Sequence, residues 1–415
     1  MSLARREVLR LAASGAVAAC ARPRERGLIW WAMGTAGENA PLLLPPFERA
    51  TGIRIEIQTI PWTGAHEKLL TAAAGNSLPD LMMLSSGWLP ELALIGALAP
   101  LPPDTALLAD QFPGAVESVK VGGRAVAVPW TADSWVQFYR RDLVREVGYE
   151  APPLDWVDWI RMARAIVRRH PDRYATIHLL DWPEPLFAFA AQQAEPLLRD
   201  RATRGNFASP GFRAALAFYK SIFDERLSPI LTGAEVGDTY IAFRRGWFAI
   251  LPSNAVTIDD LRRRAGLIPR ALWGAVPTPG PGGAGAAMAR GVSLAVSRRA
   301  RDPAKAWSLV AYLTGAALQR RMYGITGALP TRPSAWDGPG LDGDPVSKVF
   351  ADQIARSVAL PAVPEWERIM LEVQHVAEHM VRGEYGVDAA AREMDRRVDR
   401  ILEKRRSLLD RGRIA

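Results

Sequence analysis

Residues 28–84 alternate between strand-like and helix-like hydrophobic patterns, and this alternation is the feature that most restricts the fold. Residues 28–31 form a short apolar run and residues 53–57 alternate with a period of two, so both segments predict strands. Residues 38–50 and 64–74 have helical spacing, and residues 80–84 predict a third strand. The order β-α-β-α-β predicts an α/β sheet with helices packed on its faces.

The length of the chain favours more than one compact unit. Its 415 residues correspond to two or three domains of ordinary size. Strand and helix patterns continue to residue 313, and residues 346–402 read almost entirely as helix. Hydrophobic residues make up 49% of the chain, and no apolar run reaches the roughly 18 residues of a membrane-spanning helix, so the body is expected to be soluble.

The formal net charge of +8 raises nucleic acid as a partner. The basic residues are scattered along predicted helices and form no single patch, as at Arg161, Arg164, Arg168 and Arg169. We therefore interpret them as a solvated basic face and expect no nucleic acid partner.

The first 26 residues resemble an export signal. Arg5 and Arg6 form a twin-arginine start, residues 11–19 are weakly apolar, and residues 17–20 resemble a lipobox that ends in Cys20. Cys20 is the only cysteine, which excludes an internal disulfide. The alternative to lipidation is that Cys20 is a cysteine without function in a cleaved leader. We expect a signal peptide at 1–20, lipidation of Cys20, a tether at 21–26, and a periplasmic or cell-surface location on a membrane.

From residue 28 onward, the order of motifs resembles the family 1 extracellular solute-binding proteins, the sugar-binding components of bacterial ABC importers that include maltose-binding proteins. Each motif alone is a capping or turn pattern, but their order and spacing match the family over nearly the whole mature chain. The motifs include Phe-Glu-Arg-Ala-Thr-Gly-Ile at 47–53, Leu-Pro-Asp-Leu-Met at 78–82, and the segments at 96–101, 122–129, 138–143, 152–156, 242–246, 291–306 and 327–331.

This resemblance implies an α/β, two-lobe periplasmic-binding-protein fold with the ligand cleft between the lobes. The first lobe would contain residues 27–133 and 290–330, and the second residues 134–289 and 331–415. The resemblance further implies a monomer that is not an enzyme, uses no cofactor or metal, and delivers its ligand to the transmembrane permease subunits.

The carboxyl ends of strands predict part of the site without reference to the family, because ligands of open α/β sheets bind there. A sugar needs flat aromatic faces for its C–H surfaces and polar groups for its hydroxyls. Residues of both kinds follow the first three predicted strands or lie near residue 133, where the chain first crosses from one lobe to the other. They are Glu38, Trp62, Ser86, Gly87, Trp88, Trp130 and Asp133.

The resemblance adds residues from the second lobe and the second crossing. Trp182, Glu184 and Trp366 line up with cleft positions of the family, and Asp133 falls where the family has an acidic binding residue. Asn254, Arg290 and Gly291 complete the candidate set. Gly87 replaces an aspartate of maltose-type relatives, and their second-lobe tryptophan aligns near Val256, so a maltodextrin mode of binding is not expected.

Two alternatives remain open. A non-sugar solute is one: Arg290 would suit a glycerol phosphate, whereas a polyamine would use Glu38, Asp133 and Glu184. The other is a secreted zinc hydrolase, because His375, Glu378 and His379 match an H-x-x-E-H motif. That motif needs a third, downstream ligand, and we instead interpret it as a solvated helix face.

Overall fold

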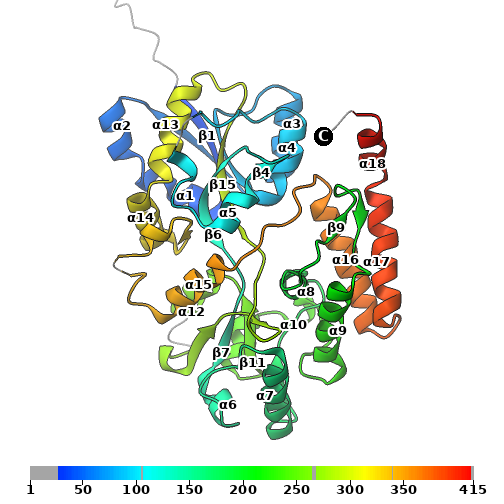
Figure 1. The fold of residues 1–415 in the computed structure, drawn as a ribbon. Helices are drawn as coiled ribbons and strands as arrows, with labels where there is room; N and C mark the ends of the chain where they lie inside the picture. Colours follow the sequence, from blue (N-terminus) through cyan, green and yellow to red (C-terminus); the bar gives the residue numbers. More distant parts are fainter. Residues whose placement is uncertain (1–26, 104–105, 264–267, 339, 413–415) are drawn as a thin grey trace, which may run out of the picture.

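A computed structural model describes residues 27–103, 106–263, 268–338 and 340–412. It has two lobes, each built around its own β-sheet (Figure 1). The expected α/β, two-lobe fold is confirmed. The predictions for Cys20, the signal peptide and the tether lie outside the described residues.

The first lobe contains a six-stranded sheet in the order β16-β6-β15-β3-β1-β2. β1 runs parallel to both β2 and β3, whereas β15 is antiparallel to β3 and β6, and β16 is antiparallel to β6. Its strands are β1 (Leu28–Met33), β2 (Ile55–Ile60), β3 (Leu81–Ser85), β6 (Val128–Asp133), β15 (Arg290–Val296) and β16 (Leu329–Pro330). Its helices are α1 (Gly34–Asn39), α2 (Pro45–Thr51), α3 (Ala65–Ala74), α4 (Leu89–Leu94), α5 (Pro113–Ser118), α13 (Pro303–Leu313) and α14 (Ala316–Thr326).

The second lobe contains a four-stranded sheet in the order β12-β7-β11-β8, in which only β11 and β8 pair in parallel. Its strands are β7 (Val136–Arg140), β8 (Tyr174–Thr176), β11 (Phe248–Ser253) and β12 (Trp273–Val276). Its helices are α6 (Arg141–Arg145), α7 (Trp156–Arg169), α8 (Glu184–Ala190), α9 (Pro210–Asp224), α10 (Gly233–Val236), α11 (Thr239–Arg244), α12 (Val256–Arg263), α15 (Pro345–Ala355), α16 (Trp366–Val381), α17 (Val387–Ile401) and α18 (Glu403–Asp410). Short hairpins pair β4 (Lys120–Val121) with β5 (Arg124–Ala125), β9 (Leu198–Arg199) with β10 (Arg204–Gly205), and β13 (Pro279–Gly280) with β14 (Gly283–Ala284).

The single helix expected over residues 38–50 is instead α1, a 3₁₀ turn (Ala40–Leu42) and α2. Pro41, Pro45 and Pro46 explain the break, because proline lacks an amide donor and clashes with the preceding turn inside a helix. α2 ends at Gly52, whose φ of 72° is the left-handed conformation that glycine adopts readily.

Buried apolar side chains form three clusters. One lies in the first lobe and one among the helices of the second. The third combines Ala132 and Leu329 of the first sheet with Phe138 and Leu251 of the second, and therefore lies at the junction. The two lobes thus share part of their buried core.

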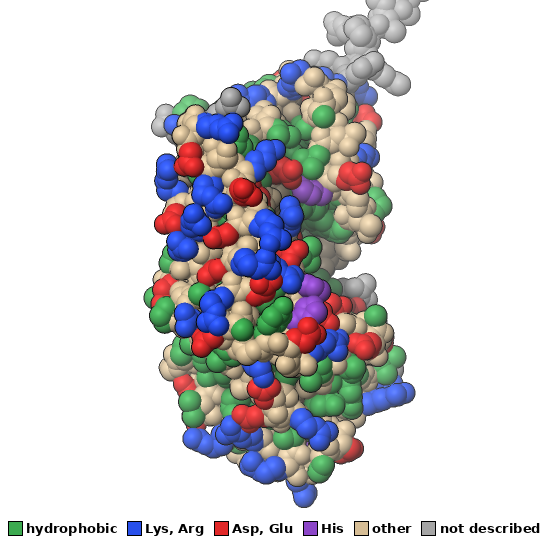
Figure 2. Space-filling view, turned by 90° about the vertical axis from the view of Figure 1, so that its right-hand side faces the viewer, with side chains coloured by type: hydrophobic (Ala, Val, Ile, Leu, Met, Phe, Trp, Pro, Cys, Tyr) green, Lys and Arg blue, Asp and Glu red, His purple; other side chains and the backbone are tan. Residues whose placement is uncertain are grey.

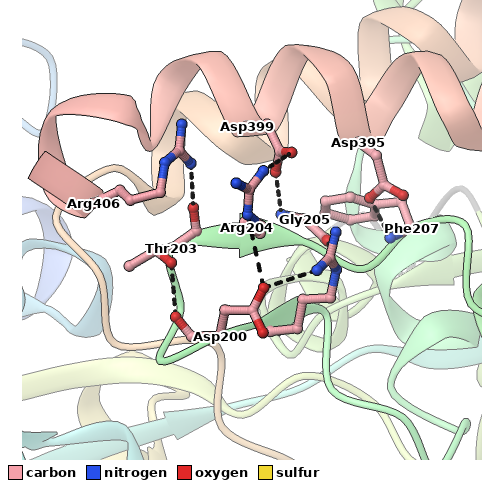
Figure 3. Close-up of polar contacts among 9 residues, drawn as sticks. Asp200, Thr203, Arg204, Gly205, Phe207, Asp395, Asp399 and Arg406 are labelled. Atoms are coloured by element: carbon pink, nitrogen blue, oxygen red, sulfur yellow. Dashed lines mark hydrogen bonds and ion pairs between the residues drawn. The ribbon is translucent and has the colours of Figure 1, made fainter. Parts of the chain in front are cut away.

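α17 holds the β9–β10 hairpin against the second lobe (Figure 3). Asp399 accepts a hydrogen bond from the backbone N–H of Gly205 at 2.9 Å, and Asp395 accepts one from the N–H of Phe207 at 2.7 Å. From α18, Arg406 donates to the carbonyl oxygen of Thr203 at 3.0 Å. These bonds fix the C-terminal helices to the body of the lobe.

The face that carries α17 and α18 shows basic side chains interspersed with acidic ones (Figure 2). Several form ion pairs on one helix, such as Arg397 with Glu393 at 2.7 Å. In the same view, an indentation at mid-height separates an upper part of the molecule from a lower part. Among the described residues, no helix is both long and apolar enough to cross a membrane.

Candidate functional site

Three aromatic side chains lie together where β2 and β3 end. The Trp62 and Trp88 ring centroids are 5.6 Å apart, and the His66 imidazole stacks on Trp88 at 5.1 Å with an interplanar angle of 10°. Nε2 of His66 is 3.0 Å from Oε2 of Glu91. Trp62 is 42% exposed, so its indole presents an accessible apolar face. We call these three side chains the aromatic group.

Gly34 allows Trp62 to lie against the end of β1. Its φ is 53°, and a Cβ at this position would be 2.6 Å from Nε1 of Trp62. His66 was not among the predicted residues. It lies four residues after Trp62, in the first turn of the following helix, and that spacing is the signal that could have identified it.

The second lobe contacts the first beside the aromatic group. A Cβ on Gly87 would be 2.3 Å from Oε1 of Glu367, in the first turn of α16. Gly87 therefore leaves room for a carboxylate from the opposite lobe. A side chain at position 87, where the sequence departs from maltose-type relatives, would displace the end of the Glu367 side chain.

Asp133 lies at the end of β6 and is tied to the second lobe. Its Oδ1 accepts hydrogen bonds from the backbone N–H groups of Ser134 at 2.9 Å and Ala255 at 3.2 Å, and its side chain also bonds to that of Asn254. Burial raises the pKa of Asp133 to about 6, although the nearby Arg290 guanidinium and these hydrogen bonds act in the opposite direction.

Arg290 connects Asp133 to the second lobe's α8. It is the partner of Asp133 in the β15–β6 register, and its Nη1 donates to Oε1 of Glu184 at 2.5 Å. Gly291 follows with a φ of 142°, and a Cβ there would be 2.0 Å from the carbonyl oxygen of Thr131. Only glycine fits that close approach of two strands.

Trp182 packs edge-on against Trp135 with ring centroids 5.6 Å apart and an interplanar angle of 78°. Both side chains are half-buried, and Trp182 contacts the junction core. Trp135 was not predicted, although its place between β6 and β7, at the first lobe crossing, could have indicated it.

Two predicted tryptophans are core residues. Trp130 lies inside β6 and packs against Trp30 at 5.6 Å, and Trp366 packs against Phe187 at 5.4 Å. Each is only 1% exposed. Trp130 therefore faces the core from within a strand and is not at an accessible position of the lobe crossing, and we leave both side chains out of the proposed site.

Two predicted residues remain, Glu38 and Ser86. Glu38 is exposed on α1, and Oγ of Ser86 is 3.5 Å from Oγ of Ser118.

A separate cavity of about 460 Å³ lies between α8, residues 193–198 and residues 358–363. None of the predicted binding residues lines that cavity.

The described residues offer no third protein ligand for the zinc ion of the hydrolase alternative. Within the described residues, no group of three or more His, Cys, Asp or Glu side chains is placed to hold a metal ion. Glu378, the general base that the motif requires, pairs with Arg382 at 2.9 Å. The H-x-x-E-H sequence therefore lacks the parts of a hydrolytic zinc site.

Comparisons with known proteins agree with the two-lobe fold. The family model described as "Bacterial extracellular solute-binding protein" matches residues 25–320. The sugar-binding protein MalE from the phytopathogen Xanthomonas citri is 39% identical, with a TM-score of 0.90 over 93% of this chain and 99% of that one. These matches confirm the resemblance carried by the sequence motifs.

More distant relatives share the fold. The cyclic alpha-maltosyl-1,6-maltose binding protein from Arthrobacter globiformis is 20% identical, with a TM-score of 0.79 over 91% of this chain and 99% of that one. A Deinococcus radiodurans protein described as "Probable ABC transporter-binding protein" is 27% identical over 276 residues, which are 60% of this chain and 62% of the relative. The chain therefore belongs to the bacterial extracellular solute-binding proteins, a family of binding proteins and not of enzymes.

Proposed function

We propose that this chain captures a mono- or oligosaccharide outside the cytoplasmic membrane by closing its two lobes, and then delivers it to the permease of an ABC importer. The observation that carries this proposal is the aromatic group beside the contact between Gly87 and Glu367. A ligand held there would meet aromatic faces from one lobe and a carboxylate from the other.

The chemistry of these side chains suits a sugar. Indole faces pack against the C–H surface of a pyranose ring, and carboxylates accept hydrogen bonds from its hydroxyl groups. Because Trp88 is the chain neighbour of Gly87, a sugar on Trp88 would lie near the Glu367 carboxylate. Ligand contacts from both lobes would stabilise the closed state relative to the open one.

The charge arrangement at the junction favours a neutral ligand over a phosphate or a polyamine. Arg290 is engaged by Glu184 and lies beside Asp133, so it does not offer a free guanidinium to a phosphate. Glu184 is paired with Arg290 and Asp133 lies beside the same guanidinium, so the junction lacks the uncompensated negative charge that a polyamine requires. The sugar-binding relative in Xanthomonas citri, at 39% identity, supports the same choice.

A thermal-shift screen followed by calorimetric titration tests the ligand class. The panel contains mono- and oligosaccharides, glycerol 3-phosphate and putrescine. A ligand at 100 times its dissociation constant raises the free energy of unfolding by about 2.7 kcal/mol, which is readily detected. Stabilisation by glycerol 3-phosphate or putrescine, without any by sugars, would overturn the proposal.

Trp62→Ala and Trp88→Ala test the placement of the site. Each should weaken sugar binding by about 2 kcal/mol, roughly 30-fold, as expected for a central aromatic contact. Trp62→Ala should hardly change the melting temperature because Trp62 is 42% exposed. Trp247→Ala, a change of half-buried Trp247 against Tyr174 in the second lobe, is the matched control and should leave the affinity unchanged.

Lobe closure and membrane anchoring need separate experiments. Small-angle scattering should give a smaller radius of gyration at saturating sugar than without it, and an unchanged radius would contradict closure.

For the anchor, the protein expressed in bacteria should fractionate with membranes and begin at a lipid-modified Cys20. Cys20→Ser should abolish this processing, and a soluble native protein with another N-terminus would contradict lipidation.

A further inference from the structure

We propose that His375 and His379 of α16 form a two-histidine binding site for a zinc ion, separate from the sugar site. Their Nε2 atoms are 3.1 Å apart. Two nitrogen ligands at the usual Zn–N distance of about 2.0–2.1 Å on a tetrahedral ion lie about 3.3 Å apart. The two imidazoles are thus already spaced to chelate one ion.

The helix supplies this spacing. Residues four apart lie on one face of an α-helix, one turn above the other, and two histidines at this spacing can bind a single zinc ion. The ring planes cross at 85° with their centroids 4.5 Å apart. His375 is exposed and the His379 side chain is 32% exposed, so an ion with its bound water can reach both nitrogens.

Glu384 places a carboxylate beside one of the two rings. Its Oε2 is 2.8 Å from Nδ1 of His379, and its backbone N–H donates to the carbonyl oxygen of His379 at 2.9 Å. A carboxylate beside Nδ1 favours the tautomer with the proton on that nitrogen; Nε2 of His379 then accepts a hydrogen bond from Nε2 of His375, and a zinc ion would displace the shared proton. Carboxylates on the far nitrogen of zinc-binding histidines favour the same tautomer.

The neighbouring charged groups leave the rest of the coordination sphere to water. Glu378 pairs with Arg382 at 2.9 Å, and the Tyr385 ring lies 6.4 Å from the His379 ring. No third His, Cys, Asp or Glu ligand lies within reach in the described part of the chain. The site would therefore bind zinc exchangeably and would not perform hydrolysis, which distinguishes it from the sequence-level zinc hydrolase hypothesis.

Zinc titration by calorimetry tests the proposal on the full chain after removal of metals with a chelator. The chain carries Cys20→Ser so that its thiol does not bind the added zinc. We expect one zinc ion per chain, loss of that ion in the His375→Ala/His379→Ala double variant, and about tenfold weaker binding in Glu384→Gln, as for other residues that orient a zinc ligand.

His170→Ala is the matched control. His170 is a helix-end histidine whose Nε2 lies 2.6 Å from a single carboxylate, that of Glu146, and its loss should leave zinc binding unchanged. Melting curves of all variants check that the fold is retained, which is expected because both histidines are on the surface. Absence of zinc binding, or equal binding by the double variant, would overturn the proposal.

Discussion

Arg290 and Glu184 join the two lobes through an ion pair with a 2.5 Å separation between Nη1 and Oε1. Arg290 begins β15 in the first lobe, and Glu184 begins α8 in the second. The Glu184 side chain is only 16% exposed, so the pair is partly shielded from water.

Glu184→Gln should loosen this connection while it keeps the shape of the side chain. We expect the closed state to lose about 1 kcal/mol and ligand affinity to fall about fivefold, as for a partly exposed ion pair. Calorimetric titration measures the loss. Glu150→Gln, which removes an exposed pair with Arg145 within one lobe, is the control, and equal losses in both variants would contradict the proposed role.

Asp133→Asn should weaken sugar binding by about 1.5–3 kcal/mol, roughly 10- to 150-fold, if the carboxylate accepts hydrogen bonds from ligand hydroxyls. The bonds from Ser134 and Ala255 indicate a second role in holding the lobe crossing. Titrations and thermal melts of the same variant separate the two roles. A lower melting temperature with unchanged affinity would assign Asp133 to the crossing alone.

The same carboxyl should also give the fold a measurable pH dependence. Its pKa is raised from 3.8 to about 6 in the folded chain, so between these values the folded state holds a proton that the unfolded state has released. The contribution of Asp133 to the free energy of unfolding should therefore decrease by about 3 kcal/mol as the pH rises from about 4 to about 6, and then stay constant.

Denaturant unfolding between pH 4 and pH 7 measures this contribution as the difference in the free energy of unfolding between wild type and Asp133→Asn. Asp172→Asn, at an exposed turn residue, controls for the general effect of removing a carboxylate. Parallel pH profiles for wild type and Asp133→Asn would contradict the raised pKa.

Gly87→Val should act as a wedge between the lobes. Its Cβ would lie 2.3 Å from Oε1 of Glu367, so closure would require the Glu367 side chain or the lobes to move. We expect about tenfold weaker sugar binding, equivalent to about 1.4 kcal/mol, and a larger radius of gyration at saturation. Glu367→Ala in the same chain should relieve the clash and reduce the Gly87→Val effect on radius. No change in either quantity for Gly87→Val would contradict the contact.

Much of the fold could be predicted from local sequence because capping and periodicity are local effects. Asp155 illustrates this: aspartate is a favoured N-cap residue, and its carboxylate accepts the N–H of Val157 at 2.8 Å at the start of α7. The same carboxylate also accepts the N–H of Gly282 at 2.7 Å and thereby ties down a Pro- and Gly-rich segment. That long-range bond leaves no trace in local sequence.

The site was harder to predict because identical residue types occupy opposite environments. Trp62 and Trp130 both follow a proline, yet Trp62 is exposed in a loop whereas Trp130 faces Trp30 inside a sheet. The side of a strand that a residue faces depends on its partner strands, and β15, the partner of β6, lies more than 150 residues away in sequence. Gly87 and Glu367 likewise meet only through the tertiary fold.

The strand order of the first sheet constrains how the chain can be made. β3 pairs with β1 on one side, but its other neighbour, β15, follows all four strands of the second sheet. Until residue 296 has left the ribosome, β3 has an unpaired edge, which is the kind of surface that promotes aggregation. Long-range pairing of this kind is slow to form. The N-terminal lobe is therefore expected to finish folding only after most of the other lobe has been synthesised, and a chain truncated before residue 290 should aggregate.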